Sequence, residues 1–371
     1  MQIAFRADAS LEIGTGHVMR CLTLADALRE RGARCNFFCR PHQGHLLGLI
    51  AQRGHQTVAL PELQEGARPN LNGTAHAHWL GTDWTTDAQD TQKALSAHTD
   101  GRPVDWLVVD HYALDARWEE ALRSQAKRLM VIDDLADRPH SCDLLLDQTF
   151  GRKAADYIPL TTEECKLLCG SQYALLRPEF GALRKYSLRR RAQPTLKELL
   201  INMGGVDKDN VTGAVLHALQ SRSLPEDCRL TVVMGQTAPW LKNVQDLACS
   251  MQRPTRVLVG VGNMAQLMAD SDLAIGAAGA TSWERCCLGL PSIMLVVAEN
   301  QLEVAKGLEE AGAALLCLSD QGLSKQLAVL LGKLCADIEQ IALLSKAAAK
   351  VANGTGAGEV LARMENRLEH A

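Results

Sequence analysis

A histidine in a glycine-rich turn near the start of the chain could carry acid–base chemistry. The turn Gly14-Thr15-Gly16-His17 follows an apolar run at residues 2–7 and precedes a helical pattern. Glycines there let a ligand approach the backbone, and the free amides of a helix start favour anions. Because an imidazole can take a proton from water, His17 is the candidate base of a ligand pocket lined by Gly14 and Gly16. The alternative is that His17 only begins the helix, satisfied by backbone.

Two further strand patterns in the first half end in groups that could assist an imidazole. Asp110-His111-Tyr112 ends one apolar run, and Asp133-Asp134 ends another. The carboxyl ends of parallel strands meet at one edge of a sheet, so these side chains should converge near His17. The aspartates would orient His17 or hold a substrate amide.

A glycine pair in the second half occupies the equivalent strand-to-helix turn. Gly204 and Gly205 follow the apolar run 198–203 and would let backbone amides approach a diphosphate. The alternative is that the pair serves turn geometry alone.

Small residues followed by hydroxyls and a carboxylate form the second candidate ligand loop. After Gly276 the chain reaches Thr281 and Ser282, suited to phosphate, and then Glu284, suited to ribose hydroxyls. The alternative is a capping box in which Glu284 returns to the helix start. Segment 299–301 ends the next strand pattern; its Asn300 and Gln301 suit sugar hydroxyls or amides, or else cap a helix.

Metal and nicotinamide sites are disfavoured. Cys35, Cys39, His42 and His45 could be zinc ligands, but residues 34–40 alternate like a core strand, which favours buried thiols. The paired aspartates lack the tight Asp-x-Asp motif of Mg²⁺-dependent sugar-nucleotide enzymes. Met19 stands where a dinucleotide fingerprint needs its third glycine. We therefore expect neither metal nor cofactor.

Composition places these sites in a two-domain protein. The chain has 371 residues, 47% of them hydrophobic, enough for two cores. A net charge of -4 and a pI near 6.3 give no reason to bind nucleic acid or an anionic membrane. With no signal-peptide pattern or membrane-length apolar run, we expect a cytoplasmic protein whose scattered cysteines are reduced.

Alternating strand and helix patterns predict two doubly wound parallel sheets, each a Rossmann-like α/β domain. The predicted boundaries are 1–180 for the first domain, 181–195 for a connecting segment, 196–352 for the second domain and 353–371 for a C-terminal helix. Residues 61–81 are polar and irregular, which indicates a surface insertion.

Taken together, these segments resemble the UDP-2,4-diacetamido-2,4,6-trideoxy-β-L-altropyranose hydrolases of bacterial pseudaminic acid biosynthesis, across both domains. The matching segments are Phe5-Arg6-Ala7-Asp8, 13–20, 110–115, 132–138, 173–180, 202–207, 276–284 and 299–301. The polar segment after Pro61 and the position of His111 depart from the family pattern and leave substrate detail open.

The resemblance implies a GT-B-like fold with two domains facing a central cleft, UDP held mainly by the C-terminal domain and the sugar facing the N-terminal one. It implies that His17 deprotonates a water that attacks the anomeric carbon with inversion, without metal or redox cofactor. Tyr112 would orient the water or the ring, and Arg177 would contact the substrate. Ser282 and Glu284 would hold phosphate and ribose.

Two other functions use the same pocket. A GT-B glycosyltransferase would pass the sugar from a UDP-linked donor to an acceptor alcohol. A non-enzymatic nucleotide-sugar sensor would need the pocket but not His17. The sequence leaves the sugar isomer, domain closure and the oligomeric state open.

Overall fold

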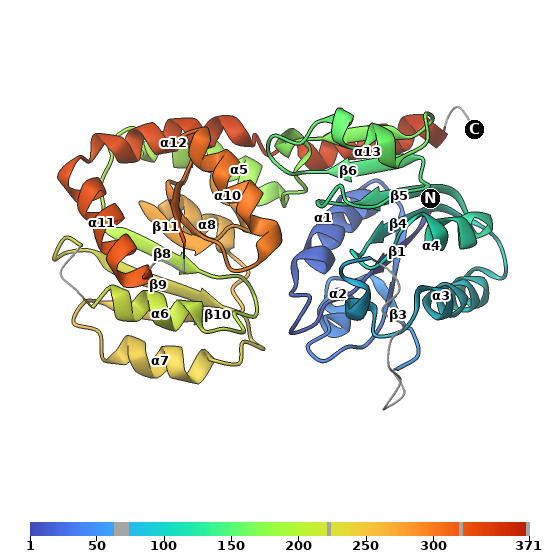
Figure 1. Ribbon diagram of the computed structural model, residues 1–371, viewed down its shortest axis with the longest axis horizontal. Helices are drawn as coiled ribbons and strands as arrows, with labels where there is room; N and C mark the ends of the chain where they lie inside the picture. The colour runs from blue at the N-terminus through green and yellow to red at the C-terminus, as the bar shows by residue number, and fades with distance from the viewer. Residues whose placement is uncertain (63–73, 221–223, 319–321, 369–371) are drawn as a thin grey trace. The chain divides into compact units, whose positions relative to one another are not determined.

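The computed structural model describes residues 1–62, 74–220, 224–318 and 322–368, which divide into two compact units (Figure 1). Unit 1 comprises Met1–Leu175 with Ala357–Ala371, and unit 2 comprises Leu176–Gly356. Each unit is built on a parallel β-sheet with helices packed against it. This confirms the predicted fold class of two Rossmann-like α/β domains.

Unit 1 is a doubly wound sheet that starts at its centre. In the described residues its order is β3-β2-β1-β4-β5-β6-β7, and every pairing is parallel. The strands are β1 Gln2–Ala7, β2 Arg34–Cys39, β3 Gln56–Ala59, β4 Val104–Asp110, β5 Ala126–Ile132, β6 Leu144–Asp147 and β7 Lys166–Cys169. The chain reverses direction across the sheet between β1 and β4, where Ala7 lies opposite Asp110. Ligand sites of such sheets form at this switch point.

The helices of unit 1 cover both faces of its sheet, so its strands are nearly continuous buried runs (Figure 1). The helices are α1 Gly16–Glu30, α2 Leu47–Gln52, α3 Trp84–Thr99, α4 Ala116–Ala121 and α13 Gly356–Leu368, with short 3₁₀ turns η1 Ala77–Leu80, η2 Arg123–Gln125, η3 Ala154–Asp156, η4 Ile158–Leu160 and η5 Ser171–Tyr173. The apolar stripe of α1 packs on the face that presents Ile3 and Phe5. Leu107 and Val109 face the opposite core, on the side of α3 and α4.

Unit 2 repeats this topology, with the order β10-β9-β8-β11-β12-β13 in its described residues. Its strands are β8 Glu198–Asn202, β9 Arg229–Met234, β10 Thr255–Val259, β11 Leu273–Ala277, β12 Ser292–Leu295 and β13 Leu315–Cys317. Its helices are α5 Pro178–Arg190, α6 Val211–Ala218, α7 Leu241–Cys249, α8 Met264–Asp270, α9 Thr281–Cys287, α10 Leu302–Glu310, α11 Leu323–Ala336 and α12 Glu339–Val351, with the 3₁₀ turn η6 Glu299–Gln301. The switch point lies between β8 and β11, where Asn202 lies opposite Gly276.

Two helices lie at the predicted domain boundaries, and the structure assigns each of them to one unit. Helix α5 covers most of the predicted connecting segment 181–195 and belongs to unit 2, because Phe180 and Ser187 are buried there. Helix α13 returns to unit 1, where Val360, Leu361 and Met364 join the core beneath α1.

Three features differ from the sequence reading. Strand β7 was not predicted. Residues 323–351, rich in Leu, Ala and Lys at helical spacing, predict one long helix but form two, α11 and α12, interrupted at Asp337. Part of the predicted insertion 61–81, residues 63–73, lies outside the described residues. The rest includes η1, whose Leu80 is buried, so this part is anchored to the core.

Candidate active site

The glycine turn between β1 and α1 places His17 beside the end of β4. Gly14 has a positive φ of 80°, and its amide donates to the carbonyl of Ser10 at 2.9 Å. A Cβ built on Gly16, the first residue of α1, meets no atom within 4 Å. The turn leaves open space around its glycines and brings His17 to the switch point of the sheet.

His17 is paired with Asp110, a fully buried carboxylate at the end of β4. Its Nδ1 lies 2.6 Å from Asp110 Oδ1, and no other hydrogen-bond partner of the imidazole is found in the described part of the chain. The alternative of a helix-start residue satisfied by backbone is therefore wrong, because the ring points to a strand-end carboxylate.

Arg20 clamps the same carboxylate from one turn further along α1. Its Nε donates to Asp110 Oδ2 at 2.6 Å and its Nη2 to Oδ1 at 2.7 Å, and Nη1 donates to Asp134 Oδ2 at 2.5 Å. Burial alone would raise the pKa of Asp110, but the charge of Arg20 and the hydrogen bonds from Arg20 and His17 outweigh burial and hold that pKa below its usual value. Asp110 is therefore ionised and held in one orientation.

The pairing decides which imidazole nitrogen can act as a base. A carboxylate only accepts hydrogen bonds, so Nδ1 carries the proton and donates it to Asp110. The free Nε2 is then the acceptor, and proton uptake there creates an imidazolium that Asp110 stabilises. This is the geometry of a general base.

Two aromatic rings, those of Tyr112 and Trp79, lie close to the imidazole of His17. The Tyr112 ring lies edge-on at 4.5 Å between centroids, and the Trp79 ring at 6.4 Å. Trp79 also stacks on Tyr112 at 5.7 Å, and His76 contacts both. His76 and Trp79 come from the predicted surface insertion, so this segment contributes to the wall around His17.

The phenol of Tyr112 is not free to handle a proton. Its hydroxyl donates to Asp134 Oδ2 at 2.7 Å, the oxygen that also receives Arg20. Burial, followed by the charge of Asp134, raises the pKa of Tyr112 well above its ordinary value. Tyr112 is thus a neutral side chain that acts on His17 through its ring.

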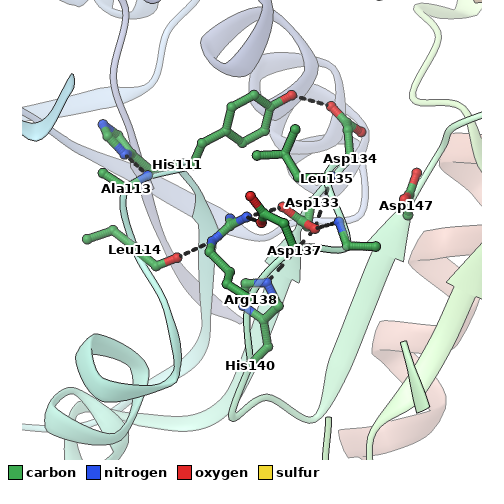
Figure 2. Close-up of polar contacts among 12 residues, drawn as sticks. His111, Ala113, Leu114, Asp133, Asp134, Leu135, Asp137, Arg138, His140 and Asp147 are labelled. Atoms are coloured by element: carbon green, nitrogen blue, oxygen red, sulfur yellow. Dashed lines mark hydrogen bonds and ion pairs between the residues drawn. The ribbon is translucent and has the colours of Figure 1, made fainter. Parts of the chain in front are cut away.

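The two neighbouring aspartates at the end of β5 have different partners (Figure 2). Asp134 joins the Tyr112–Arg20 cluster. Asp133 accepts from the amide of Ala136 at 2.9 Å and pairs with Arg138 at 2.8 Å. The prediction that both converge near His17 therefore holds for Asp134, whereas Asp133 stabilises its own turn.

A second buried network surrounds Asp8 at the end of β1. Arg6 Nη1 pairs with Asp8 Oδ1 at 2.7 Å, and the Nε2 atoms of His42 and His111 lie 3.5 and 3.4 Å from Asp8 Oδ2. The amide of Ala113 donates to His111 Nδ1, so neutral His111 carries its proton on Nε2, facing Asp8. A nitrogen in that state does not ligate a metal.

The possible zinc ligands separate in the fold. Cys35 and Cys39 are buried strand residues of β2, while His42 turns toward Asp8. Within residues 1–62, 74–220, 224–318 and 322–368, no group of three histidine, cysteine or acidic side chains is arranged to hold a metal ion. The helices in those ranges include none long and apolar enough to cross a membrane.

In unit 2, the first predicted ligand loop follows β8. Gly204 has a positive φ of 92°, and a Cβ built there meets no atom within 4 Å. The carbonyl of Gly205 lies against Gly235, so close that a Cβ on Gly235 would overlap it. Asp207 accepts from the amides of Val211 and Thr212 at 2.9 Å, which ties the loop to the start of α6.

The second predicted loop follows β11, the neighbour of β8. Thr281 and Ser282 begin α9, and Thr281 is partly exposed while Ser282 is buried. Glu284 keeps 17% of its side chain exposed and lies 3.6 Å from Arg177, which also pairs with Glu179 at 3.0 Å. The predicted ribose ligand and the predicted substrate arginine therefore lie together, and Arg177 orients Glu284.

The two residues predicted as ligands in η6, Asn300 and Gln301, have different surroundings. Gln301 accepts from the amide of Val297 at 3.1 Å, and its Nε2 lies 3.7 Å from a Cβ built on Gly279, which places it beside the β11 loop. Asn300 is exposed, and its side chain makes no hydrogen bond within the described ranges. The capping-box alternative is not observed, because the Glu284 carboxylate faces Arg177.

Sequence reasoning gave no role to Arg20, Trp79 or His76. Arg20 had a detectable signal, because it is a cation one turn after His17 on a helix whose other buried residues beyond His17, apart from Thr23, are apolar. Trp79 and His76 had none, since only folding brings residues 76–80 against Tyr112.

Comparison with known proteins shows that the chain is similar in sequence to a glycosyltransferase domain and in fold to GT-B proteins. Residues 204–359 match the sequence model of the glycosyltransferase family 28 C-terminal domain. Acinetobacter baumannii MurG has a TM-score of 0.65 at 17% identity, covering 98% of this chain and 99% of MurG. The fold is therefore GT-B.

Two curated relatives align with most of the chain. A UDP-2,4-diacetamido-2,4,6-trideoxy-β-L-altropyranose hydrolase of Campylobacter jejuni is 24% identical over 312 residues, 84% of this chain and 97% of that enzyme. An uncharacterised protein of Methanocaldococcus jannaschii is 26% identical over 310 residues, 82% of this chain. The aligned region spans 57% of that archaeal protein's length.

Proposed function

We propose that this chain hydrolyses UDP-2,4-diacetamido-2,4,6-trideoxy-β-L-altropyranose to UDP and the free sugar, with His17 as the general base. The observation that carries the proposal is the His17–Asp110 pair, whose geometry leaves Nε2 as a proton acceptor. The similarity to the Campylobacter jejuni hydrolase supports the substrate, since it extends over 84% of this chain.

In the proposed step one proton is transferred, one bond to the anomeric carbon forms and another breaks. A water oxygen attacks the anomeric carbon while its proton passes to His17 Nε2. The bond from that carbon to the β-phosphate oxygen breaks, and its electron pair leaves with UDP. Because attack and departure occur on opposite faces, the product has the inverted anomeric configuration. Asp110 stabilises the imidazolium that forms.

Residues of unit 2 are assigned to the nucleotide. The open turn at Gly204 and Gly205 suits backbone contact with a diphosphate. Thr281 and Ser282 offer hydroxyls for phosphate oxygens. Glu284, oriented by Arg177, is an acceptor for ribose hydroxyls. Gln301, beside Gly279, is an amide for the sugar or its substituents, and we give Asn300 the same role.

Glycosyl transfer is the second candidate, and the match of residues 204–359 to a glycosyltransferase domain favours it. A base that activates water can also activate an acceptor alcohol. The two reactions differ in what accepts the sugar, so an acceptor requirement separates them.

The test is UDP release by the purified full-length protein from a panel of UDP-linked 2,4-diacetamido sugars. Release without any acceptor, with an inverted free sugar identified by NMR and mass spectrometry, is the expected result. Release only with an added acceptor would establish a transferase. UDP-sugar binding without turnover in either condition would indicate a sensor.

The same assay tests His17 and the metal question. His17→Ala should abolish UDP release while UDP binding stays nearly unchanged, because the imidazole is assigned to the water and not to the nucleotide. Full activity of that variant would remove the proposed base. Excess EDTA should leave the rate unchanged, and strong inhibition by EDTA would contradict metal-independent hydrolysis.

A further inference from the structure

Arg285, on α9, is a buried cation without a carboxylate partner. Its side chain is 1% exposed, and in the described part of the chain its guanidinium forms no ion pair with a carboxylate, although the charge of Glu284 acts on it from beyond ion-pairing distance. Burial lowers the pKa of Arg285 to about 10, so the group remains charged at neutral pH. An uncompensated buried charge is unfavourable, so its surroundings must supply the compensation.

Arg191, in the same unit, shows how a buried arginine is satisfied by the fold alone. Its Nε, Nη1 and Nη2 donate to the carbonyls of Gly289, Ala269 and Met268 at 3.0, 3.3 and 2.8 Å. Carbonyl oxygens at helix ends carry partial negative charge, which compensates the guanidinium. Arg191 is therefore a structural cation.

Arg285 has different hydrogen-bond partners from those of Arg191. Its Nη2 donates to one carbonyl, that of Ala277, at 2.8 Å, and among the described residues its Nε finds no partner. The remaining contacts go to two hydroxyls, from Nη1 to Thr281 Oγ1 at 3.2 Å and from Nη2 to Ser282 Oγ at 3.1 Å. Two of the three hydrogen bonds of Arg285 therefore go to hydroxyls, whereas all three of those made by Arg191 go to carbonyls.

Gly276 makes room for this guanidinium at the end of β11. A Cβ built on Gly276 would lie 2.5 Å from Arg285 Nη1 and 2.8 Å from the carbonyl oxygen of Asn202. Real side chains do not tolerate such contacts, so a glycine is needed for the guanidinium to lie beneath the loop. The arginine is thus built into the loop that carries Thr281 and Ser282.

The hydroxyl contacts have a direction. Each hydroxyl oxygen accepts from Arg285 and keeps its own proton to donate, and in the described residues neither proton has a recorded acceptor. Accepting from a cation polarises the O–H bond and makes it a stronger donor. Thr281 is partly exposed, so its proton can reach a bound ligand.

We propose that Arg285 is a positioning residue for a phosphate ligand, acting through the hydroxyl of Thr281, and that the phosphate adds a counter-charge near the buried guanidinium. The inference rests on the proposed function in taking UDP as that ligand, but the chemistry calls only for a phosphate or diphosphate group. Arg285 itself does not touch the ligand.

The experiment compares Kd values of the full-length protein for UDP, pyrophosphate and uridine, by calorimetry and by NMR titration for uridine. The variants are Arg285→Gln, Arg285→Lys and, as the matched buried arginine, Arg191→Gln. Arg285→Gln should weaken UDP and pyrophosphate by about tenfold or more and leave uridine unchanged, because the lost interaction is charge-assisted. Arg285→Lys should lie between wild type and the glutamine variant.

The UDP-to-uridine affinity ratio separates positioning from general damage. Arg191→Gln should keep the wild-type ratio whatever its stability. An unchanged ratio in Arg285→Gln would overturn the proposal. If that variant does not fold, an unchanged ratio in Arg285→Lys would overturn it equally.

Pyrophosphate distinguishes this inference from the proposed function. Binding of pyrophosphate that Arg285→Gln weakens supports Arg285 even if no UDP-sugar is hydrolysed. Hydrolysis that persists with unchanged phosphate affinities in Arg285→Gln supports the hydrolase and removes the role of Arg285. The proposed role of Arg285 would also be overturned if the wild-type protein bound neither UDP nor pyrophosphate.

Discussion

Asp110→Asn should separate the orientation of His17 from the stability of unit 1. The wild-type carboxylate accepts from His17 Nδ1 at 2.6 Å and from two nitrogens of Arg20 at 2.6 and 2.7 Å. An asparagine has one acceptor and one donor, so its amide NH₂ must face Arg20 Nε or the His17 side. Either orientation sets a donor against a donor.

The two orientations bracket the loss of activity. With the oxygen toward His17, a neutral acceptor replaces a charged one, and the bond weakens by about 1–1.5 kcal/mol, which lowers kcat by about 5- to 13-fold. With the NH₂ toward His17, the proton moves to Nε2 and the base is lost, which costs about 10⁴-fold. The assay is UDP release at saturating substrate, with UDP affinity measured alongside and expected to stay unchanged.

Asp133→Asn is the matched control for Asp110→Asn. Asp133 is equally buried, ends the neighbouring strand and pairs with Arg138, but it does not contact His17. Both variants should lose stability, so both are assayed well below their unfolding temperatures. A kcat for Asp110→Asn within about threefold of wild type would refute the reasoning, since even the milder orientation predicts a larger loss. Equal losses in the two folded variants would show a structural effect.

Two further predictions concern Tyr112 and acid stability. Tyr112→Phe removes the hydrogen bond to Asp134 but keeps the ring against His17. The kcat of UDP release should therefore fall less than about tenfold, and the free energy of unfolding in urea should fall by about 1 kcal/mol. Loss of all activity would return a catalytic role to the phenol. For Asp8 and Asp133, burial would raise the pKa, but Arg6 and Arg138 respectively hold it below the ordinary value of 3.8. Their ionised forms therefore stabilise the fold fully above about pH 4, and this contribution is lost as pH falls through the folded pKa values. Urea midpoints should fall progressively as the pH is lowered below about 4, less steeply in Asp133→Asn, and equal slopes would contradict this assignment.

Local sequence determined much of the fold because parallel α/β units have strong local signals. Apolar runs bounded by turns predicted most strands, and the glycine turn at residues 14–17 marked the switch point. Strand β7 was missed because Lys166–Cys169 is a four-residue strand with little alternation. Residues 178–190 lacked a long apolar stripe, and α5 is held instead by Phe180, Ser187 and arginine contacts to carbonyls.

Residue types and their place after strands singled out His17, Asp110, Tyr112, Thr281, Ser282 and Glu284. The sequence could not say which partner each would take. Only the register of β1 against β4 put His17 on Asp110, and only a helical turn brought Arg20 to the same carboxylate. Tyr112, expected to orient the water or the ring, donates its hydroxyl to Asp134.

The chain by itself determined that an imidazole would stand at a glycine turn, because local spacing sets which residues follow a strand. Tertiary structure decided which nitrogen of His17 is free, since that depends on a carboxylate 93 residues away. It likewise decided that Arg285 is buried without a carboxylate and that Trp79 reaches His17. Burial and charge pairing are properties of the packed chain, and no local pattern encodes them.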